Sequence, residues 1–160
     1  MVLTQGADYA LYVNRKGYLF QSLNFNYSEI KNFEPITLDI DLEKAEAGTT
    51  AVLENIFFDL DKYDLKEKSI TELQKVVRFL TENPTVKVEI GGHTDNQGAV
   101  DYNKQLSLKR AESVSAYLMQ NGVDPKRIKM KGFGADKPLA DNSTEQGRQK
   151  NRRIEFKILP

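Results

Sequence analysis

The sequence predicts an α+β fold: a two-layer α/β sandwich in which a mixed sheet has its helices on one face, preceded by a short β segment. From residue 51 onward, strand-like stretches alternate with two long amphipathic segments in the order βαβαβ-β. Strands after the first are apolar at every second residue only, so helices should cover one face of the sheet and charged cross-strand pairs the other. The small polar run EKAEAGTT at residues 43–50 marks a boundary, giving segments 1–48 and 49–160.

The first segment is expected to be a partial β sandwich. Apolar residues alternate along 9–13, NRKG at residues 14–17 offers a hairpin turn into a second strand at 18–25, and a third strand is expected over 36–42. The run YALYVNRKGYLFQSLNF at residues 9–25 is similar to the closing strands of carboxypeptidase-regulatory-like domains. We therefore interpret residues 1–48 as the end of such a domain.

In the second segment, periodicity predicts each element in turn. Strands are expected at 52–58, 86–91, 127–133 and from Ile154 onward, with Ile128 and Met130 facing inward. Helices are expected at 66–82 and 103–121, and one helical turn near Glu145 within the polar loop 134–151. In the first helix, Glu72 is expected to face water.

An acid and a base at the centre of this segment need a partner. Asp95 follows the strand at 86–91, and Arg110 projects onto the inward stripe of the next helix, beside Asn103 and Ser107. An unpaired guanidinium on an inward face is costly. Asp95 or the carboxylate of a ligand could provide the partner, and both alternatives stay open at this point.

The C-terminal two-thirds of the chain resembles the OmpA-like peptidoglycan-binding domain of outer-membrane protein A, peptidoglycan-associated lipoproteins and flagellar-stator proteins. The resemblance rests on motifs in a fixed order. They are FFD at 57–59, GHTD at 92–95, Gly98, Asn103, LS at 106–107, RA at 110–111, YLMQNGV at 117–123, GFG at 132–134, Pro138, Asn142, Thr144, Gly147 and NRRIE at 151–155.

The resemblance implies non-covalent binding of peptidoglycan through the diaminopimelate of its stem peptide. Asp95 would take the ammonium of this zwitterion, and Arg110 would hold its carboxylate in a two-pronged contact. Thr94 offers a hydroxyl, Asn103 an amide and Phe58 an apolar wall. The family adds Asp59 and Leu106 to the binding cleft. Further candidate contacts are Gly98, Ser107, Asn151 and Arg152.

Several of these residues also have ordinary structural explanations. Asp95 and Arg110 could bridge each other, Asn103 could cap the helix, and Arg152 could be solvated or paired. A second hypothesis for the function is a protein-interaction module of an envelope or secretion complex, in which the wall site is vestigial.

Catalysis has no support in the sequence. Ser107 lies within a helix and lacks a G-x-S-x-G elbow, and Asp59, Asp61 and Asp64 lack the other ligands of an EF-hand. With one histidine and no cysteine, we expect no metal site, no cofactor and no enzyme activity.

Composition argues against one class of partner, whereas the resemblance implies the other partners and the location. Lys and Arg number 23, as do Asp and Glu, so the formal net charge is zero and nucleic acid is not an expected partner. The expected partners are peptidoglycan and other envelope proteins. The expected location is the Gram-negative periplasm in association with the outer membrane, and the β segment suits an outer-membrane or secretion-associated lipoprotein.

Overall fold

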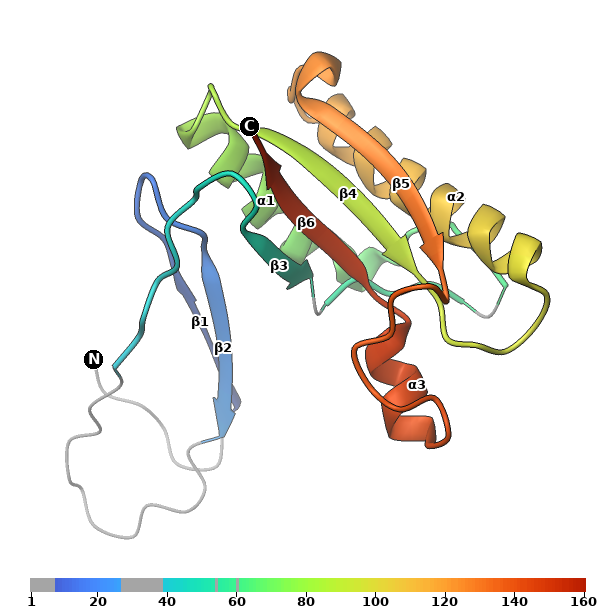
Figure 1. Cartoon of the computed structure of the whole chain (residues 1–160). Helices are drawn as coiled ribbons and strands as arrows, with labels where there is room; N and C mark the ends of the chain where they lie inside the picture. The colour runs from blue at the N-terminus through green and yellow to red at the C-terminus, as the bar shows by residue number, and fades with distance from the viewer. Residues whose placement is uncertain (1–7, 27–38, 54, 60) are drawn as a thin grey trace, which may run out of the picture.

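The computed structural model describes residues 8–26, 39–53, 55–59 and 61–160 (Figure 1). Short 3-10 turns at Glu67–Ser69 and Pro125–Arg127 accompany the regular elements. Those elements are β1 (Asp8–Val13), β2 (Gln21–Asn26), β3 (Thr50–Leu53), α1 (Ile70–Glu82), β4 (Lys87–His93), α2 (Val100–Gln120), β5 (Ile128–Gly134), α3 (Glu145–Asn151) and β6 (Ile154–Leu159).

The main sheet is mixed, as predicted. Its strand order is β3-β6-β4-β5, with β4 and β5 parallel and the other two pairs antiparallel. Helices α1 and α2 lie on the same face of this sheet, and α3 lies beyond its end (Figure 1). The predicted α+β sandwich is therefore confirmed, and the predicted helical turn at Glu145 is the start of α3.

Alternation along β6 separates the core from the open face. Ile154, Phe156 and Ile158 are buried under the helices, and Phe156 meets Phe79 of α1 edge to face at 5.5 Å between ring centroids. On the open face, Glu89 of β4 lies opposite a lysine in each neighbouring strand. Opposite charges at such paired positions stabilise a sheet whose second face meets water.

The strand predicted at residues 52–58 ends early, because β3 stops at Leu53. Residues 55–59 run instead toward the start of α1. There the N–H of Phe57 donates to Ser69 Oγ at 2.9 Å, and the Phe57 carbonyl accepts the N–H of Lys66 at 3.2 Å. These bonds replace a strand ladder, so Phe58 and Asp59 lie in a loop that leaves the sheet.

One inward residue is less buried than expected, and one predicted orientation is wrong. Met130 lies in register with the buried Ile90 on the helix-covered face, yet it is 43% exposed because β5 is an edge strand. Glu72 is buried rather than facing water, and its carboxylate accepts hydrogen bonds from Asn55 at 3.3 Å and from Lys75 at 3.0 Å. A buried carboxylate with such partners is tolerated on a helix face that would otherwise be apolar.

The N-terminal hairpin is confirmed, but its connection is longer than the predicted turn at residues 14–17. Val13 pairs with Gln21 in the antiparallel register, so residues 14–20 form the loop. Within this loop Leu19 and Phe20 are buried, and the ring of Phe20 lies 6.1 Å from that of Phe79. The loop therefore contributes side chains to the core beside α1. It still contains a tight turn that overlaps the predicted one, in which Tyr18 N–H donates to the carbonyl of Arg15 at 3.0 Å and Gly17 has a φ of 82°.

Of the third strand expected at 36–42, residues 36–38 lie outside the described part, and residues 39–42 are not in a strand. The backbone at 43–44 instead accompanies the hairpin loop, since Leu19 N–H donates to the carbonyl of Glu43 at 2.7 Å. The division into segments 1–48 and 49–160 stays a prediction.

Replacement of Phe20 by alanine should lower the free energy of unfolding by about 3 kcal/mol, because it leaves a cavity against Phe79. Urea unfolding followed by circular dichroism measures this change. Gln21→Ala is the matched control at an exposed neighbouring position and should change stability by less than about 0.5 kcal/mol. Equal effects of the two substitutions would show that the loop does not pack on α1.

Candidate functional site

A cleft of about 880 Å³ opens where β4 ends and the loop to α2 begins. The loop 55–59, the loop after β4, the first turns of α2, and α3 all contribute to its walls. The lining residues are Ile56, Phe57, Phe58, Asp59, Asp61, Thr94, Asp95, Gln97, Gly98, Tyr102, Asn103, Leu106, Arg110, Glu145, Arg148, Gln149 and Arg152. Clefts of this volume accommodate ligands larger than one amino-acid head group.

Close packing of α2 on the sheet determines where its side chains lie. A Cβ atom on Gly92 of β4 would be 2.0 Å from the carbonyl oxygen of Ser107, and one on Gly132 of β5 would be 2.5 Å from that of Lys104. Only glycine permits this approach. Ser107 Oγ also accepts the N–H of Gly134 at 2.9 Å. Ser107 therefore holds α2 against the sheet and does not line the cleft, contrary to its candidate role.

Arg110 lies about one turn further along α2 and is 8% exposed. Its Nε donates to the carbonyl of Lys62 at 2.9 Å, its Nη2 donates to that of Asp59 at 3.3 Å, and the guanidinium carbon lies 5.0 Å from the centre of the Phe58 ring. Burial lowers the pKa of Arg110, and the negative charge of Asp61 opposes that shift. Within the described part of the chain, no carboxylate forms an ion pair with Arg110, so its charge is solvated by neutral carbonyls.

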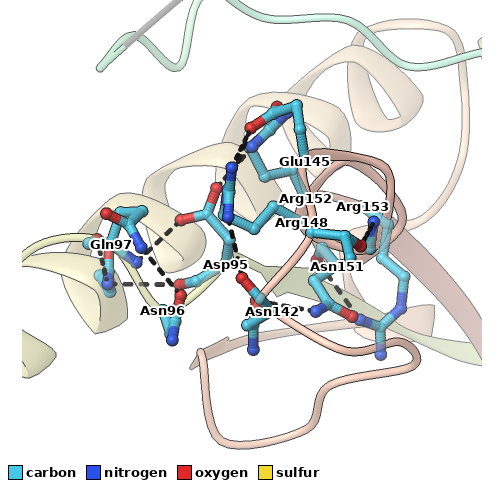
Figure 2. Close-up of polar contacts among 12 residues, drawn as sticks. Asp95, Asn96, Gln97, Asn142, Glu145, Arg148, Asn151, Arg152 and Arg153 are labelled. Carbon is cyan, nitrogen blue, oxygen red and sulfur yellow. Dashed lines mark hydrogen bonds and ion pairs between the residues drawn. The ribbon is translucent and has the colours of Figure 1, made fainter.

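Asp95 has a different partner from the one considered in the sequence. Its Oδ1 accepts the N–H of Gln97 at 3.0 Å, and its Oδ2 accepts Nη1 of Arg152 at 2.6 Å (Figure 2). Nη2 of the same arginine donates to Glu145 at 2.8 Å. The direct bridge between Asp95 and Arg110 is therefore not formed. Arg152 is paired, in agreement with the structural explanation that the sequence offered for it.

The other predicted site residues separate into two groups. Phe58, Asp59, Thr94, Gly98, Asn103 and Leu106 line the cleft together with Asp95, Arg110 and Arg152. Asn151 does not; its Oδ1 accepts the N–H groups of Leu139 at 2.7 Å and Ala140 at 3.0 Å, so it braces the loop before α3.

Thr94 and Asn103 have distinct environments within the cleft. Thr94 Oγ1 is buried and has no hydrogen-bond partner among the described residues, which leaves it able to bind a ligand. Asn103 is not the helix cap, since α2 begins at Val100. Its Nδ2 donates to the carbonyl of Gln97 at 2.8 Å and so fixes the loop that carries Asp95.

Of the α3 wall of the cleft, the sequence identified Arg152 alone and missed Glu145, Arg148 and Gln149. The spacing of these four lining residues, i, i+3, i+4 and i+7, is the signature of one helix face. This polar periodicity was the available signal, but it lay in a stretch interpreted as a loop.

On the opposite wall, the sequence did not identify Asp61 and Tyr102. Asp61 has a φ of 55°, in the left-handed region that aspartate tolerates better than most residues. Burial, followed by the hydrogen bond with Asp61, raises the pKa of the Tyr102 phenol. The hydrogen bond from Lys66 lowers the pKa of the neighbouring Asp59 carboxyl.

His93 lies outside the cleft lining and is 1% exposed. Its ring stacks on Phe133 with centroids 4.8 Å apart, and its Nε2 lies 3.3 Å from a carboxylate oxygen of Glu155. Burial, aided by the positive charge of Arg153, lowers the pKa of His93 to about 4. Ser107 Oγ donates to the carbonyl of Lys104 at 2.9 Å, so these contacts give no support to a Ser–His catalytic pair.

Comparison with known proteins identifies the family of this fold. Residues 57–152 match the OmpA family. Outer membrane porin F of Pseudomonas fluorescens is 40% identical over 104 residues, which cover 65% of this chain and 32% of the porin. The crystal structure of the peptidoglycan-associated lipoprotein from Burkholderia pseudomallei has a TM-score of 0.60 at 31% identity, over 64% of this chain and 87% of that one.

A further solved structure, the cell wall anchor of the T6SS from Pseudomonas aeruginosa, has a TM-score of 0.60 at 25% identity, over 69% of this chain and 78% of that one. The chain belongs to the OmpA family, as its motifs predicted. The match spans about a third of the length of the outer-membrane relatives.

These relatives, which include outer-membrane proteins and peptidoglycan-associated lipoproteins, locate the protein in the periplasm in association with the outer membrane, as predicted. In the described part of the chain, every helix is too short or too polar to cross a membrane. The resemblance of residues 9–25 to carboxypeptidase-regulatory-like domains lies outside the family match and stays a prediction.

Gly92→Ala should lower the free energy of unfolding by about 3 kcal/mol and weaken ligand binding, because its Cβ would force the backbone of Ser107 away from the sheet. Thermal unfolding measures the first effect. Gly91→Ala is the matched control: its Cβ would meet side-chain atoms rather than backbone, the Phe133 ring at 3.0 Å and Nε2 of His93 at 3.5 Å. A Gly92→Ala variant as stable as wild type would refute the close packing of α2.

Acidification should destabilise the protein through His93. Because its pKa is about 4 in the folded state and 6.5 in the unfolded chain, the unfolded chain binds the proton more readily. The stabilisation is fully present above pH 6.5 and is lost as the pH falls toward 4, amounting to roughly 3 kcal/mol. Urea unfolding of wild type and His93→Gln from pH 7 to 4.5 tests this. The difference between the two proteins in how the unfolding free energy depends on pH gives the contribution of His93. The same pH dependence in both would contradict the lowered pKa of His93.

Proposed function

We propose that the cleft binds peptidoglycan non-covalently through the diaminopimelate of its stem peptide. In this role the domain anchors an outer-membrane-associated protein or complex to the cell wall. The observation that carries the proposal is the environment of Arg110, a buried guanidinium in the cleft. Among the described residues its hydrogen-bond acceptors are carbonyl oxygens rather than carboxylates. Such a cation retains its attraction for an anion and has N–H groups left to donate.

The ligand class follows from the charges on the two sides of the cleft. Diaminopimelate in a stem peptide presents a free ammonium and a free carboxylate on its distal carbon. Asp95 can accept the ammonium and Arg110 can hold the carboxylate, while Thr94 Oγ1 offers a further hydrogen bond. Asp95 and Arg110 line one cleft, which allows both charges to face the same ligand.

The relatives support the same assignment. One solved structure at 31% identity is of a peptidoglycan-associated lipoprotein, and another at 25% identity is of a cell wall anchor. We propose no catalytic step. One cleft of this kind gives modest affinity, which many copies engaging one polymer would raise. Incubation of purified sacculi with the protein should release no soluble fragments, and release over time would contradict a purely binding role.

Arg110→Lys should weaken binding about 10- to 100-fold while the fold is retained, because lysine cannot reproduce the two-pronged contact. Calorimetry with a soluble diaminopimelate stem peptide and pulldown on sacculi measure the loss, and circular dichroism checks the fold. A stem peptide with lysine in place of diaminopimelate lacks the distal carboxylate and should bind similarly weakly to wild type and to Arg110→Lys.

Lys109→Ala is the matched control, since it removes a neighbouring positive charge that does not line the cleft. It should bind as wild type does. Retention on sacculi that survives both Asp95→Ala and Arg110→Ala would reject the proposed site and favour a protein-interaction role. Equal affinity of wild type for the lysine and diaminopimelate peptides would reject the role of Arg110.

A further inference from the structure

Arg152 occupies the side of Asp95 that a ligand ammonium would need. Its Nη1 donates to Asp95 Oδ2 at 2.6 Å, one of the shortest ion pairs among the described residues (Figure 2). The other oxygen of Asp95 already accepts the N–H of Gln97. With the Asp95 side chain only 12% exposed, little open surface remains on the carboxylate for a second cation.

The same arginine has a second carboxylate available. Nη2 of Arg152 donates to Glu145 at 2.8 Å, and Glu145 is itself held by Arg148, whose Nη2 donates to it at 2.7 Å. Glu145 is therefore fixed on the exposed face of α3, on the far side of Arg152 from Asp95 (Figure 2). An arginine released from Asp95 would keep its contact with Glu145 and would lose only one of its two ion pairs.

We propose that Arg152 is a built-in competitor for the cation site of Asp95, and that it keeps its ion pair with Glu145 when a ligand ammonium displaces it from Asp95. This inference rests on the proposed function, because it concerns how the same cleft accepts its ligand. Arg152 is thus a positioning residue that the ligand displaces rather than one that the ligand contacts.

The exchange makes the site selective. An ammonium group alone must replace a charge-assisted hydrogen bond of similar strength and gains little. A ligand that also places a carboxylate on Arg110 gains a second contact that offsets the displacement. Because Arg152 must be displaced first, a ligand that carries an amine but no carboxylate binds the cleft weakly.

The test uses the whole chain and two probes: a soluble diaminopimelate stem peptide, and the same peptide acetylated on the distal amine. Arg152→Gln should bind the free-amine peptide about fivefold more tightly than wild type, because the competing ion pair is gone. It should not tighten binding of the acetylated peptide, which has no ammonium to place at Asp95. Calorimetry measures the four dissociation constants.

Glu145→Gln tests whether Arg152 keeps its second partner during the exchange. The ion pair between Arg152 and Glu145 is formed while Arg152 contacts Asp95 and is retained after displacement, so its loss should largely cancel, and the affinity for the free-amine peptide should change by less than about twofold. A loss of affinity as large as that of Arg110→Lys would show that Glu145 itself contacts the ligand and would overturn the proposal.

Lys150→Gln is the matched control for charge. It removes one positive charge from the same helix at an exposed position outside the cleft lining. If it tightens binding as much as Arg152→Gln does, general electrostatics explains the change and the proposal is wrong. Weaker binding by Arg152→Gln would likewise overturn it, since Arg152 would then be a ligand contact.

Two further comparisons keep these outcomes distinct. Melting temperatures check the fold of each variant. If Arg152→Gln does not fold, Arg152→Lys takes its place: it keeps the charge but cannot span two carboxylates, so it should tighten binding by a smaller factor. Failure of wild type to bind the free-amine peptide would reject the proposed function and this inference together. Binding that is lost in Arg110→Lys but not tightened in Arg152→Gln would reject this inference alone.

Discussion

The packing of α2 directly on the backbone of β4 and β5 is the constraint on which the site depends. At Gly92 and Gly132 the helix lies so close to the sheet that a single methyl group would collide with its backbone. Ser107 fastens the same turn through Gly134. Because a helix is rigid over one turn, this contact fixes Arg110 relative to the loop that carries Asp95. The geometry of the cleft is thus a consequence of how tightly two secondary-structure layers can approach.

The two charges at the centre of the cleft are stabilised in opposite ways. Arg110 is held by backbone carbonyls and by the face of Phe58, which satisfy its hydrogen bonds without cancelling its charge. Asp95 is held by another ion, the guanidinium of Arg152. The cationic side of the site is therefore preorganised for an anion, whereas the anionic side is neutralised until its partner moves. Preorganisation lowers the cost of ordering on binding, and an exchangeable partner adds selectivity.

The secondary structure could be predicted from the sequence where the periodicity of apolar residues matches one buried face. The strand β6 and the helix α1 were predicted well because their apolar residues repeat with the period of one element and face one core. Asp95 and Arg110 could be singled out because a charge on an inward face needs an explanation. The helix α3 was underestimated because its regular face is polar, and polar periodicity in a short stretch does not distinguish a helix from a loop. For Met130 the alternation identified the correct face of the strand, but it does not show that β5 lies at the edge of the sheet, where this side chain stays partly exposed.

The path of the chain into the sheet has a mechanical consequence. Gly48 and Thr49 join the sheet beside Ile158, which pairs with Val88 at the start of β4, whereas Asp95 follows the opposite end of that strand. A load between a ligand in the cleft and the chain upstream of Gly48 would therefore be directed along the strands. Interstrand hydrogen bonds run across that direction, so many of them would have to shear together instead of opening one after another. The geometry that positions the cleft also orients the domain to resist being pulled apart.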